Sequence, residues 1–477
     1  MQSMALSTTE KTEKSSTTEK TTGRVDPEPA SHIPRSTLRR AIAASAMGNA
    51  TEWFDYGVYA LTVPYISKVF FPGDGASGTL WALLTFAISF LVRPLGGLVW
   101  GPLGDRLGRK QILAATIVMM SGATFCVGLL PTHAAVGAWA PAALILLRMV
   151  QGFSTGGEYG GAATFMAEYA PDRKRGFCGS FLEFGTLGGY AFGALLVLLV
   201  DLGLDDGAMQ TWGWRLPYLI AGPLGLVGLY LRSKMEDTPC FQELEQSGGN
   251  ESNLGHELHE LATVYRQPVV LLFGLVVALN VANYTLLSFM PTYLGSHIGL
   301  TDTQGLVIML VVQLVMMALL PMCGALSDRV GRKPMWRASL VGLFVLAVPM
   351  FLVMRLSFLG ALVGLIVLGG FFILQLSTIS ATFPAMFPTQ VRFAGFALSY
   401  NVATSVFGGT CPLINEWLID KLGSDLVPAG YLMASCLVGL VALPFVTETA
   451  GVSLRGRGVP GVISRPAGRR PGRDRAS

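Results

Sequence analysis

Long apolar runs alternate with short polar stretches along most of the chain. A helix that crosses a bilayer needs about 20 mainly apolar residues. Segments of this kind lie near 41–65, 79–103, 111–131, 139–168, 178–200, 215–232, 268–294, 304–326, 335–354, 359–386, 394–418 and 426–447. The pattern therefore predicts an all-α polytopic membrane protein with twelve transmembrane helices, surrounded by a lipid bilayer.

The composition agrees with this prediction. Hydrophobic residues make up 51% of the chain, charged residues only 13%, and the mean hydropathy is +0.52. Soluble domains carry roughly 25% charged residues. A net charge of +4 in short basic clusters argues against a nucleic-acid partner. The six cysteines and five histidines lack metal-ligand spacing, so neither a metal nor a cofactor is expected.

A polar stretch at 233–267 separates two sets of six apolar segments, 41–232 and 268–447. We interpret it as a cytoplasmic linker. Residues 1–40 are rich in Ser, Thr, Glu and Lys, which predicts a disordered cytoplasmic tail rather than a signal peptide. Residues 448–477 are rich in Gly, Arg and Pro, which predicts a second, basic disordered tail that touches anionic lipid headgroups.

Basic residues gather in every second loop, whereas the opposite loops hold few. Lys and Arg concentrate in cytoplasmic loops of membrane proteins. This pattern predicts a multi-pass membrane protein with both termini in the cytoplasm. The basic clusters include Arg35, Arg39, Arg40, Arg106, Arg109, Lys110, Arg173, Lys174, Arg175, Arg232, Lys234, Arg329, Arg332, Lys333 and Arg392.

The two halves repeat one another. Residues 101–110 read GPLGDRLGRK and residues 324–333 read GALSDRVGRK. Pro171 with Arg175 is echoed by Pro388 with Arg392. Two matched motifs at a shift of about 220 residues predict two pseudo-symmetric six-helix bundles.

The paired loop resembles the signature of the major facilitator superfamily. Its glycines permit a tight turn, and Asp105 or Asp328 can meet arginines and a helix N-terminus, which would latch a cytoplasmic gate. The alternative is a solvated basic turn that obeys membrane topology alone. The predicted gate residues are Gly101, Asp105, Arg106, Gly108, Arg109, Gly324, Asp328, Arg329, Gly331 and Arg332.

Longer segments resemble the metabolite:proton symporter family: GNATEWFDYGVYA (48–60), FLVRPLGGLVWGPLGDRLGRK (90–110) and RMVQGFSTGGEYGGAATFMAEYAPDRKRGF (148–177). TFPAMFPTQVRFAGFALSYN (382–401) and NYTLLSFMPTYL (283–294) are similar to the proline/glycine betaine branch. The resemblance implies a secondary active transporter that takes up a small zwitterionic osmolyte with protons by alternating access. Some carriers of this branch end in a heptad-bearing helix, and the tail here has no such repeat.

Ionisable residues inside the spans need a partner or a task, because an isolated charge in a bilayer is costly. Glu158 is the first candidate for the proton carrier, followed by Glu52 and Asp55. Arg93 can pair with Glu52 or Asp55, and the alternative role of such a pair is to order the first bundle. Glu183 is interpreted as a gate residue or a solvated one.

A zwitterion needs an arginine or a helix N-terminus for its carboxylate and aromatic faces for its cation. Arg93 or Arg148 would supply the first. The other predicted site residues are aromatic side chains and amides, although aromatics in membrane spans mostly pack or lie at interfaces: Trp53, Tyr56, Tyr159, Tyr284, Tyr400, Asn280, Asn283 and Asn401.

Other functions remain as alternatives. Proton symport of a carboxylate metabolite (2-oxoglutarate, citrate or shikimate) would need a denser cationic site, with both Arg93 and Arg148 facing the cavity. An exporter would carry a G-x-x-x-G-P-x-x-G-G pattern, which the fifth span lacks. A transporter-like sensor would bind its ligand without accumulating it. No P-loop or catalytic constellation suggests an enzyme, and relatives of this kind commonly work as monomers.

Overall fold

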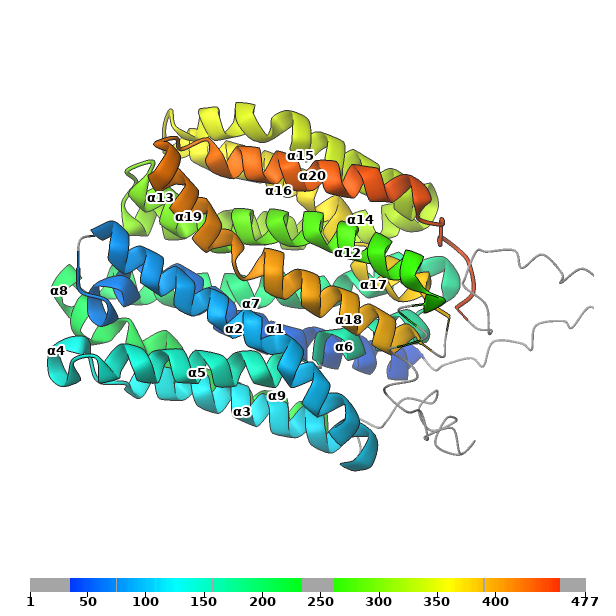
Figure 1. Cartoon of the computed structure of the whole chain (residues 1–477), viewed down its shortest axis with the longest axis horizontal. Helices are drawn as coiled ribbons and strands as arrows, with labels where there is room; N and C mark the ends of the chain where they lie inside the picture. Colours follow the sequence, from blue (N-terminus) through cyan, green and yellow to red (C-terminus); the bar gives the residue numbers. More distant parts are fainter. Residues whose placement is uncertain are drawn as a thin grey trace, which may run out of the picture.

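The computed structural model describes residues 35–73, 75–107, 109–156, 158–233, 259, 261, 263–388 and 391–454. Long helices run side by side through these residues, and no β-strand occurs among them (Figure 1). This arrangement suits a bilayer, because a helix satisfies its own backbone hydrogen bonds.

The first six spans come from residues 35–233. They are α1 (Arg35–Phe70), α2 (Gly75–Leu107), α3 (Arg109–Leu129), α5 (Trp139–Thr155) with α6 (Glu158–Tyr169), α7 (Arg175–Gly203) and α9 (Arg215–Ser233). Two short helices, α4 (His133–Val136) and α8 (Asp206–Ala208), lie in the connections.

The second six spans come from residues 266–445, and several are interrupted near their middle. The first is α12 (Arg266–Asn283), continued by the π-helix η3 (Tyr284–Phe289) and by α13 (Met290–Ser296). The next three are α14 (Asp302–Val330), α15 (Arg332–Met354), and α16 (Phe358–Leu376) with α17 (Ile379–Thr382). The last two are α18 (Arg392–Ala403), continued by the π-helix η5 (Thr404–Gly408) and by α19 (Cys411–Leu422), and α20 (Val427–Ala442) with η6 (Leu443–Phe445). Each of the twelve predicted apolar segments falls on one of these spans.

Seven of the described helical segments are long and apolar enough to cross a membrane by length and composition alone. The remaining spans include α1, which carries Glu52 and Asp55, and the spans α5–α6 and α18–α19, which are divided. Buried charges and helix breaks at membrane depth are tolerated where protein covers them. The charged residues of α1 and the breaks in α5–α6 and α18–α19 are therefore expected to face the interior of the bundle.

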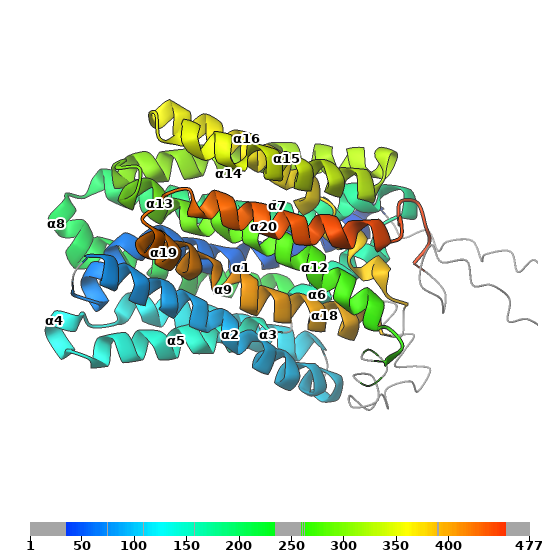
Figure 2. The same ribbon diagram turned by 45° about the horizontal axis from the view of Figure 1, so that its top comes forward.

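Helices of the first half pack as α1 on α7, α2 on α5 and α3 on α9, and those of the second half as α15 on α16 and α12 on α20. The halves meet mainly along α7 and α14. The first residue of α1 and the last of α20 lie at the same end of the bundle, here called the terminal end; the other is the far end (Figures 1 and 2). The predicted linker and both predicted tails fall largely outside the described residues, so their assignment stays a prediction.

Close contact between the halves depends on glycine at the terminal end of α14. A Cβ added to Gly324 would lie 2.6 Å from the carbonyl oxygen of Gly176 and 2.8 Å from Ser180 Cβ. A side chain at position 324 would therefore push α14 away from α7. This close approach explains why a glycine opens the second copy of the repeated loop.

Candidate functional site

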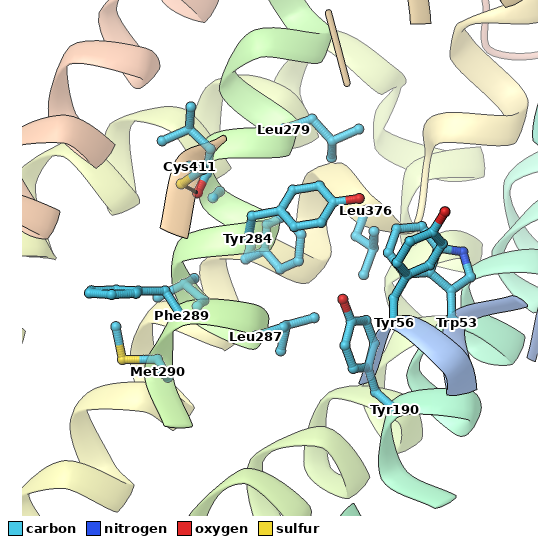
Figure 3. Packing of buried hydrophobic residues seen from close by; sticks show 14 of the residues in the cluster. Trp53, Tyr56, Tyr190, Leu279, Tyr284, Leu287, Phe289, Met290, Leu376 and Cys411 are labelled. Carbon is cyan, nitrogen blue, oxygen red and sulfur yellow. Dashed lines mark hydrogen bonds between the residues drawn. The ribbon is translucent and has the colours of Figure 1, made fainter. Parts of the chain in front are cut away.

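Aromatic rings from both halves meet in the middle of the bundle. We call Trp53 and Tyr56 of α1, Phe86 and Phe90 of α2, Tyr190 of α7 and Tyr284 of η3 the central aromatic cluster. The ring centroids of Trp53 and Tyr190 lie 5.6 Å apart, and those of Phe90 and Tyr284 lie 5.2 Å apart. All six side chains are buried. Figure 3 shows the hydroxyl end of Tyr284 pointing toward Trp53 and Tyr56.

Arg93 of α2 borders this cluster. Its Nη2 donates a 2.8 Å hydrogen bond to Glu52 Oε1, and its guanidinium carbon lies 5.7 Å from the Tyr56 ring centroid and 5.5 Å from that of Phe90. Arg93 Nε and Nη1 are buried without a hydrogen-bond partner among the described residues, as is Tyr284 Oη. A buried donor left unpaired costs about 1–3 kcal/mol. A ligand oxygen could satisfy these donors.

Arg148 of α5 has a different environment, because residues of the first half surround it. Its Nη1 lies 3.2 Å from Asp55 Oδ2 and 2.8 Å from Gln151 Oε1. Asp55 Oδ1 also accepts hydrogen bonds from Thr124 Oγ1 (2.7 Å) and Gln151 Nε2 (2.9 Å). The guanidinium carbon lies 4.3 Å from the centroid of the Tyr59 ring. Arg148 and Asp55 therefore belong to one internal network.

Glu183 of α7 is buried, with 2% of its surface exposed, so the interpretation of it as a solvated residue is wrong. Tyr159 Oη donates a hydrogen bond to Glu183 Oε1, and Thr186 Oγ1 donates a 3.0 Å bond to Oε2. The Tyr159 ring stacks on Tyr400 of α18 at a centroid distance of 4.5 Å. Glu158 begins α6, but its side chain lies outside the described part of the chain.

The three candidate asparagines differ in their contacts. Asn280 Nδ2 donates to Thr404 Oγ1 (2.9 Å) within the second half, and Asn401 Nδ2 donates to the carbonyl oxygen of Gly156 (2.8 Å) across the two halves. Both amides thus join helices. Asn283 is buried, and its Oδ1 has no hydrogen-bond partner among the described residues. Of the three, Asn283 has an acceptor left for a ligand.

The second copy of the repeated loop joins the two halves at the terminal end, in a contact that we call the latch. Asp328 Oδ1 and Oδ2 accept hydrogen bonds from the backbone nitrogens of Gly176 (2.8 Å) and Phe177 (2.9 Å), at the N-terminus of α7. Arg332 Nη2 lies 2.6 Å from Asp328 Oδ1. A carboxylate is favoured at a helix N-terminus, where backbone N–H groups are unpaired. The contact therefore joins α14 of one half to α7 of the other.

The remaining predicted gate residues belong to both copies of the repeated loop, and the structure describes those of the second copy more fully. Gly331 has a φ of +106°, which a residue with a side chain rarely adopts. Arg329 is exposed, and no ion pair of its side chain occurs among the described residues. In the first copy, Gly101 lies in α2. Gly108 and the side chains of Asp105, Arg106 and Arg109 lie outside the described residues.

Sequence reasoning missed a segment that crosses the terminal end after α20. Arg175 Nη1 donates to the carbonyl oxygen of Val452 (3.0 Å), and Arg392 Nη2 donates to that of Leu454 (2.8 Å). Glu448 accepts bonds from the backbone nitrogens at the start of α15. Burial raises the pKa of Glu448, but backbone hydrogen bonds lower it more, so the net shift is downward. The only sequence signal for these contacts was the repetition of Pro171 and Arg175 as Pro388 and Arg392.

A second group, at the far end, was also missed. His297 Nε2 lies 2.9 Å from Glu416 Oε2, and its Nδ1 lies 3.7 Å from Asp425 Oδ1. Arg355 Nη2 lies 2.8 Å from Asp425 Oδ2. Burial lowers the pKa of His297, but the hydrogen bond and charge of Glu416, with the charge of Asp425, raise it above its usual value. The four residues lie far apart in the sequence, so no local motif marks them.

Comparisons with known proteins agree with this architecture. The major facilitator superfamily model matches residues 46–410. The chain is 43% identical to the glycine betaine/proline/ectoine/pipecolic acid transporter OusA of Dickeya dadantii and to the proline/betaine transporter of Escherichia coli, covering 88% of this chain and 85% of each relative. It is 42% identical to the ectoine/proline transporter ProP of Corynebacterium glutamicum, covering 89% and 87%.

The fold also resembles solved structures. The proton:xylose symporter XylE, bound to 6-bromo-6-deoxy-D-glucose, superposes with a TM-score of 0.71 at 17% identity, over 88% of this chain and 98% of that one. At this identity the likeness supports the fold alone. With the family match and the relatives above, it shows that the chain is a multi-pass secondary active transporter of the major facilitator superfamily, in the family of these proline, betaine and ectoine carriers.

Proposed function

We propose that this protein takes up a small zwitterionic osmolyte of the proline, glycine betaine or ectoine type together with protons. One observation supports this most strongly. Arg93 has two buried guanidinium nitrogens without hydrogen-bond partners in the part of the chain that the structure describes, and it lies beside the central aromatic cluster. A cationic donor next to several aromatic faces matches a molecule with a carboxylate at one end and a cation at the other.

In this proposal the substrate carboxylate accepts hydrogen bonds from Arg93 and Tyr284. The substrate cation lies against the faces of Trp53, Tyr190 and Tyr284, whose centroids are separated by 5.6 Å (Trp53–Tyr190) and 6.2 Å (Trp53–Tyr284). Asn283 precedes Tyr284 and supplies a further acceptor. Glu52 fixes the orientation of the Arg93 guanidinium through their 2.8 Å ion pair.

Alternating access would use the latch at the terminal end. While Asp328 holds the N-terminus of α7, that end is closed; breaking the two backbone hydrogen bonds allows the halves to separate there. Among the proposed proton carriers, Glu52 and Asp55 each pair with an arginine. Those pairs support the alternative that these two acids order the first bundle, and Glu158 stays a candidate for the coupled proton.

A carboxylate metabolite is the second candidate substrate, and the arrangement of the arginines favours it less. A dianion should need both Arg93 and Arg148. Arg148 is held by Asp55, Gln151 and the Tyr59 ring within the first half. Among the described residues Arg148 keeps one buried nitrogen, Nε, without a hydrogen-bond partner, whereas Arg93 keeps two, so Arg93 is the better match for a single carboxylate.

Several further features belong to the same proposal. Both termini would lie in the cytoplasm, so that the terminal end faces the cytoplasm and the far end the outside of the bacterial inner membrane. The protein would work as a monomer, without a cofactor and without catalysis. The partners would be protons, the osmolyte and the bilayer.

Uptake into proteoliposomes tests the proposal. Radiolabelled glycine betaine is offered under an imposed proton gradient, with and without a protonophore, and unlabelled proline, ectoine, 2-oxoglutarate, citrate and shikimate serve as competitors. We expect accumulation that the protonophore abolishes and that proline, but not 2-oxoglutarate, inhibits. Accumulation of 2-oxoglutarate or shikimate without betaine uptake would refute the proposed substrate. Binding without accumulation would indicate a sensor.

A further inference from the structure

Four acidic side chains are buried in the described part of the chain, and their counter-charges differ. Glu52 pairs with Arg93, Asp55 with Arg148 and Glu416 with His297. Glu183 has no basic side chain within ion-pair distance among the described residues, and its partners are two hydroxyl groups. Of these four acids, Glu183 is therefore the one whose negative charge would have to be neutralised by binding a proton.

Burial disfavours the ionised form of a carboxyl group unless a cation or several donors compensate. Both neighbours of Glu183, Tyr159 and Thr186, are hydroxyls. A hydroxyl donates to a carboxylate and accepts from a carboxylic acid. The site can therefore hold either protonation state without exchanging its partners.

Few other titratable groups surround Glu183 in the part of the chain that the structure describes. Tyr159 of α6 contacts it directly, and Tyr400 of α18 interacts with it electrostatically. On α1, the neutral Asn49 contacts Thr186. The helices α14 and α17, which also pack on α7, place no charged side chain within ion-pair distance of Glu183 in the described residues.

A chain of hydrogen bonds joins Glu183 to the proposed substrate site. Trp53 Nε1 donates to Asn49 Oδ1 (3.1 Å), and Asn49 Nδ2 donates to Thr186 Oγ1 (2.6 Å). Thr186 Oγ1 in turn donates to Glu183 Oε2 (3.0 Å). Trp53 is one of the faces proposed to hold the substrate cation. A shift of Trp53 on substrate binding would thus reach the carboxyl group of Glu183.

Glu183 also lies close to the boundary between the two halves. Tyr159 belongs to the first half and stacks on Tyr400 of the second. Glu183 is eight residues from the start of α7, or about 12 Å from the latch at 1.5 Å per residue. Opening of the terminal end would part the Tyr159–Tyr400 stack and let water reach the carboxyl group.

We propose, building on the proposed function, that Glu183 carries the proton that is coupled to substrate movement. Its carboxylate gains a proton from water while the far end is open, forming an O–H bond. It returns that proton to water when the terminal end opens, so the step needs no other reactant.

Transport by Glu183→Gln, which mimics the protonated group, tests this proposal in proteoliposomes. We expect gradient-driven accumulation of glycine betaine to fall to the level seen with protonophore. Counterflow exchange, which needs no net proton movement, should stay within about two-fold of wild type. Glu416→Gln, a buried acid with a basic partner, should keep gradient-driven accumulation. Normal accumulation by Glu183→Gln, or loss of its counterflow as well, would overturn the proposal.

Infrared difference spectra between low and high pH provide a readout that does not depend on the substrate. The full chain in lipid vesicles should show the carbonyl stretch of a buried protonated carboxyl group. The band should disappear in Glu183→Gln and remain in Glu158→Gln and Glu416→Gln. A band that persists in Glu183→Gln, or disappears in Glu158→Gln instead, would refute the proposal. Failure of wild-type betaine uptake would refute the proposed function, and the spectra would still decide the role of Glu183.

Discussion

Replacing Asp328 with alanine should open the terminal end. The substitution removes two hydrogen bonds between the halves, from the backbone nitrogens of Gly176 and Phe177 to a charged acceptor. Hydrogen bonds to charged groups are worth about 1.5–3 kcal/mol each. The ion pair with Arg332 lies within one half and contributes little to the difference between the open and closed states. The closed state should therefore lose at least about 3 kcal/mol, the sum of the two lower limits, which shifts the equilibrium at least on the order of 100-fold.

Cys178 provides a built-in reporter for this opening. It lies in α7 beside the latch and is buried, with 5% of its surface exposed. In a variant that keeps Cys178 as its only cysteine, the rate of labelling by a water-soluble maleimide should report the open fraction. We expect Asp328→Ala to raise that rate at least on the order of 100-fold.

Two matched variants serve as controls for the labelling. Arg329→Ala removes an exposed neighbour and should change the rate by about two-fold at most. Asp328→Asn removes the charge but keeps one oxygen acceptor, so its increase should be smaller than that of alanine. A labelling rate for Asp328→Ala that matches the parent would refute the reasoning that this contact closes the terminal end.

Three further predictions concern stability and binding. Asp55→Ala leaves Arg148 buried without its counter-ion and should lower the stability in detergent by about 3–5 kcal/mol, measured by thermal unfolding; an unchanged melting temperature would contradict this. His297 has a raised pKa, so stability from its pair with Glu416 is full at low pH and is lost as pH rises through that pKa; the His297→Gln variant should lack this pH dependence. Tyr284→Phe removes a buried hydroxyl that has no hydrogen-bond partner among the described residues, so it should raise the KM for betaine and leave stability nearly unchanged.

Much of the fold follows from the sequence because spans of about 20 apolar residues are a strong local signal. The repeated loop also predicted a carboxylate at a helix N-terminus, and Asp328 makes that contact with α7. The breaks near Tyr284 and Thr404 escaped prediction. Both are π-helical turns inside apolar runs. The first, YTLLSF, holds no Pro or Gly, and the second, TSVFG, ends in Gly408, which also occurs inside regular helices of this chain such as α7, so neither segment differs clearly from a regular helix in sequence.

The site was harder to predict, since it depends on which residues meet across helices. Helical spacing placed Glu52 and Asp55 on one face of α1, but it did not decide which arginine each would meet. Arg93 pairs with Glu52, and Arg148 pairs with Asp55. The burial of Glu183 depends on Tyr159, from another span, and could not be read from the apolar pattern around it.

The most direct test of the zwitterion site compares three ligands of similar shape. Glycine betaine carries both charges; 3,3-dimethylbutyrate keeps the carboxylate but replaces the ammonium by carbon; choline keeps the ammonium but lacks the carboxylate. Competition against labelled betaine in proteoliposomes measures the contribution of each end. If Arg93 and the central aromatic cluster bind the two ends, betaine should compete at least about ten-fold better than either analogue, with each lost interaction worth about 1.4 kcal/mol or more. Equal competition by betaine and 3,3-dimethylbutyrate would contradict recognition of the cation, and equal competition by betaine and choline would contradict the role of Arg93.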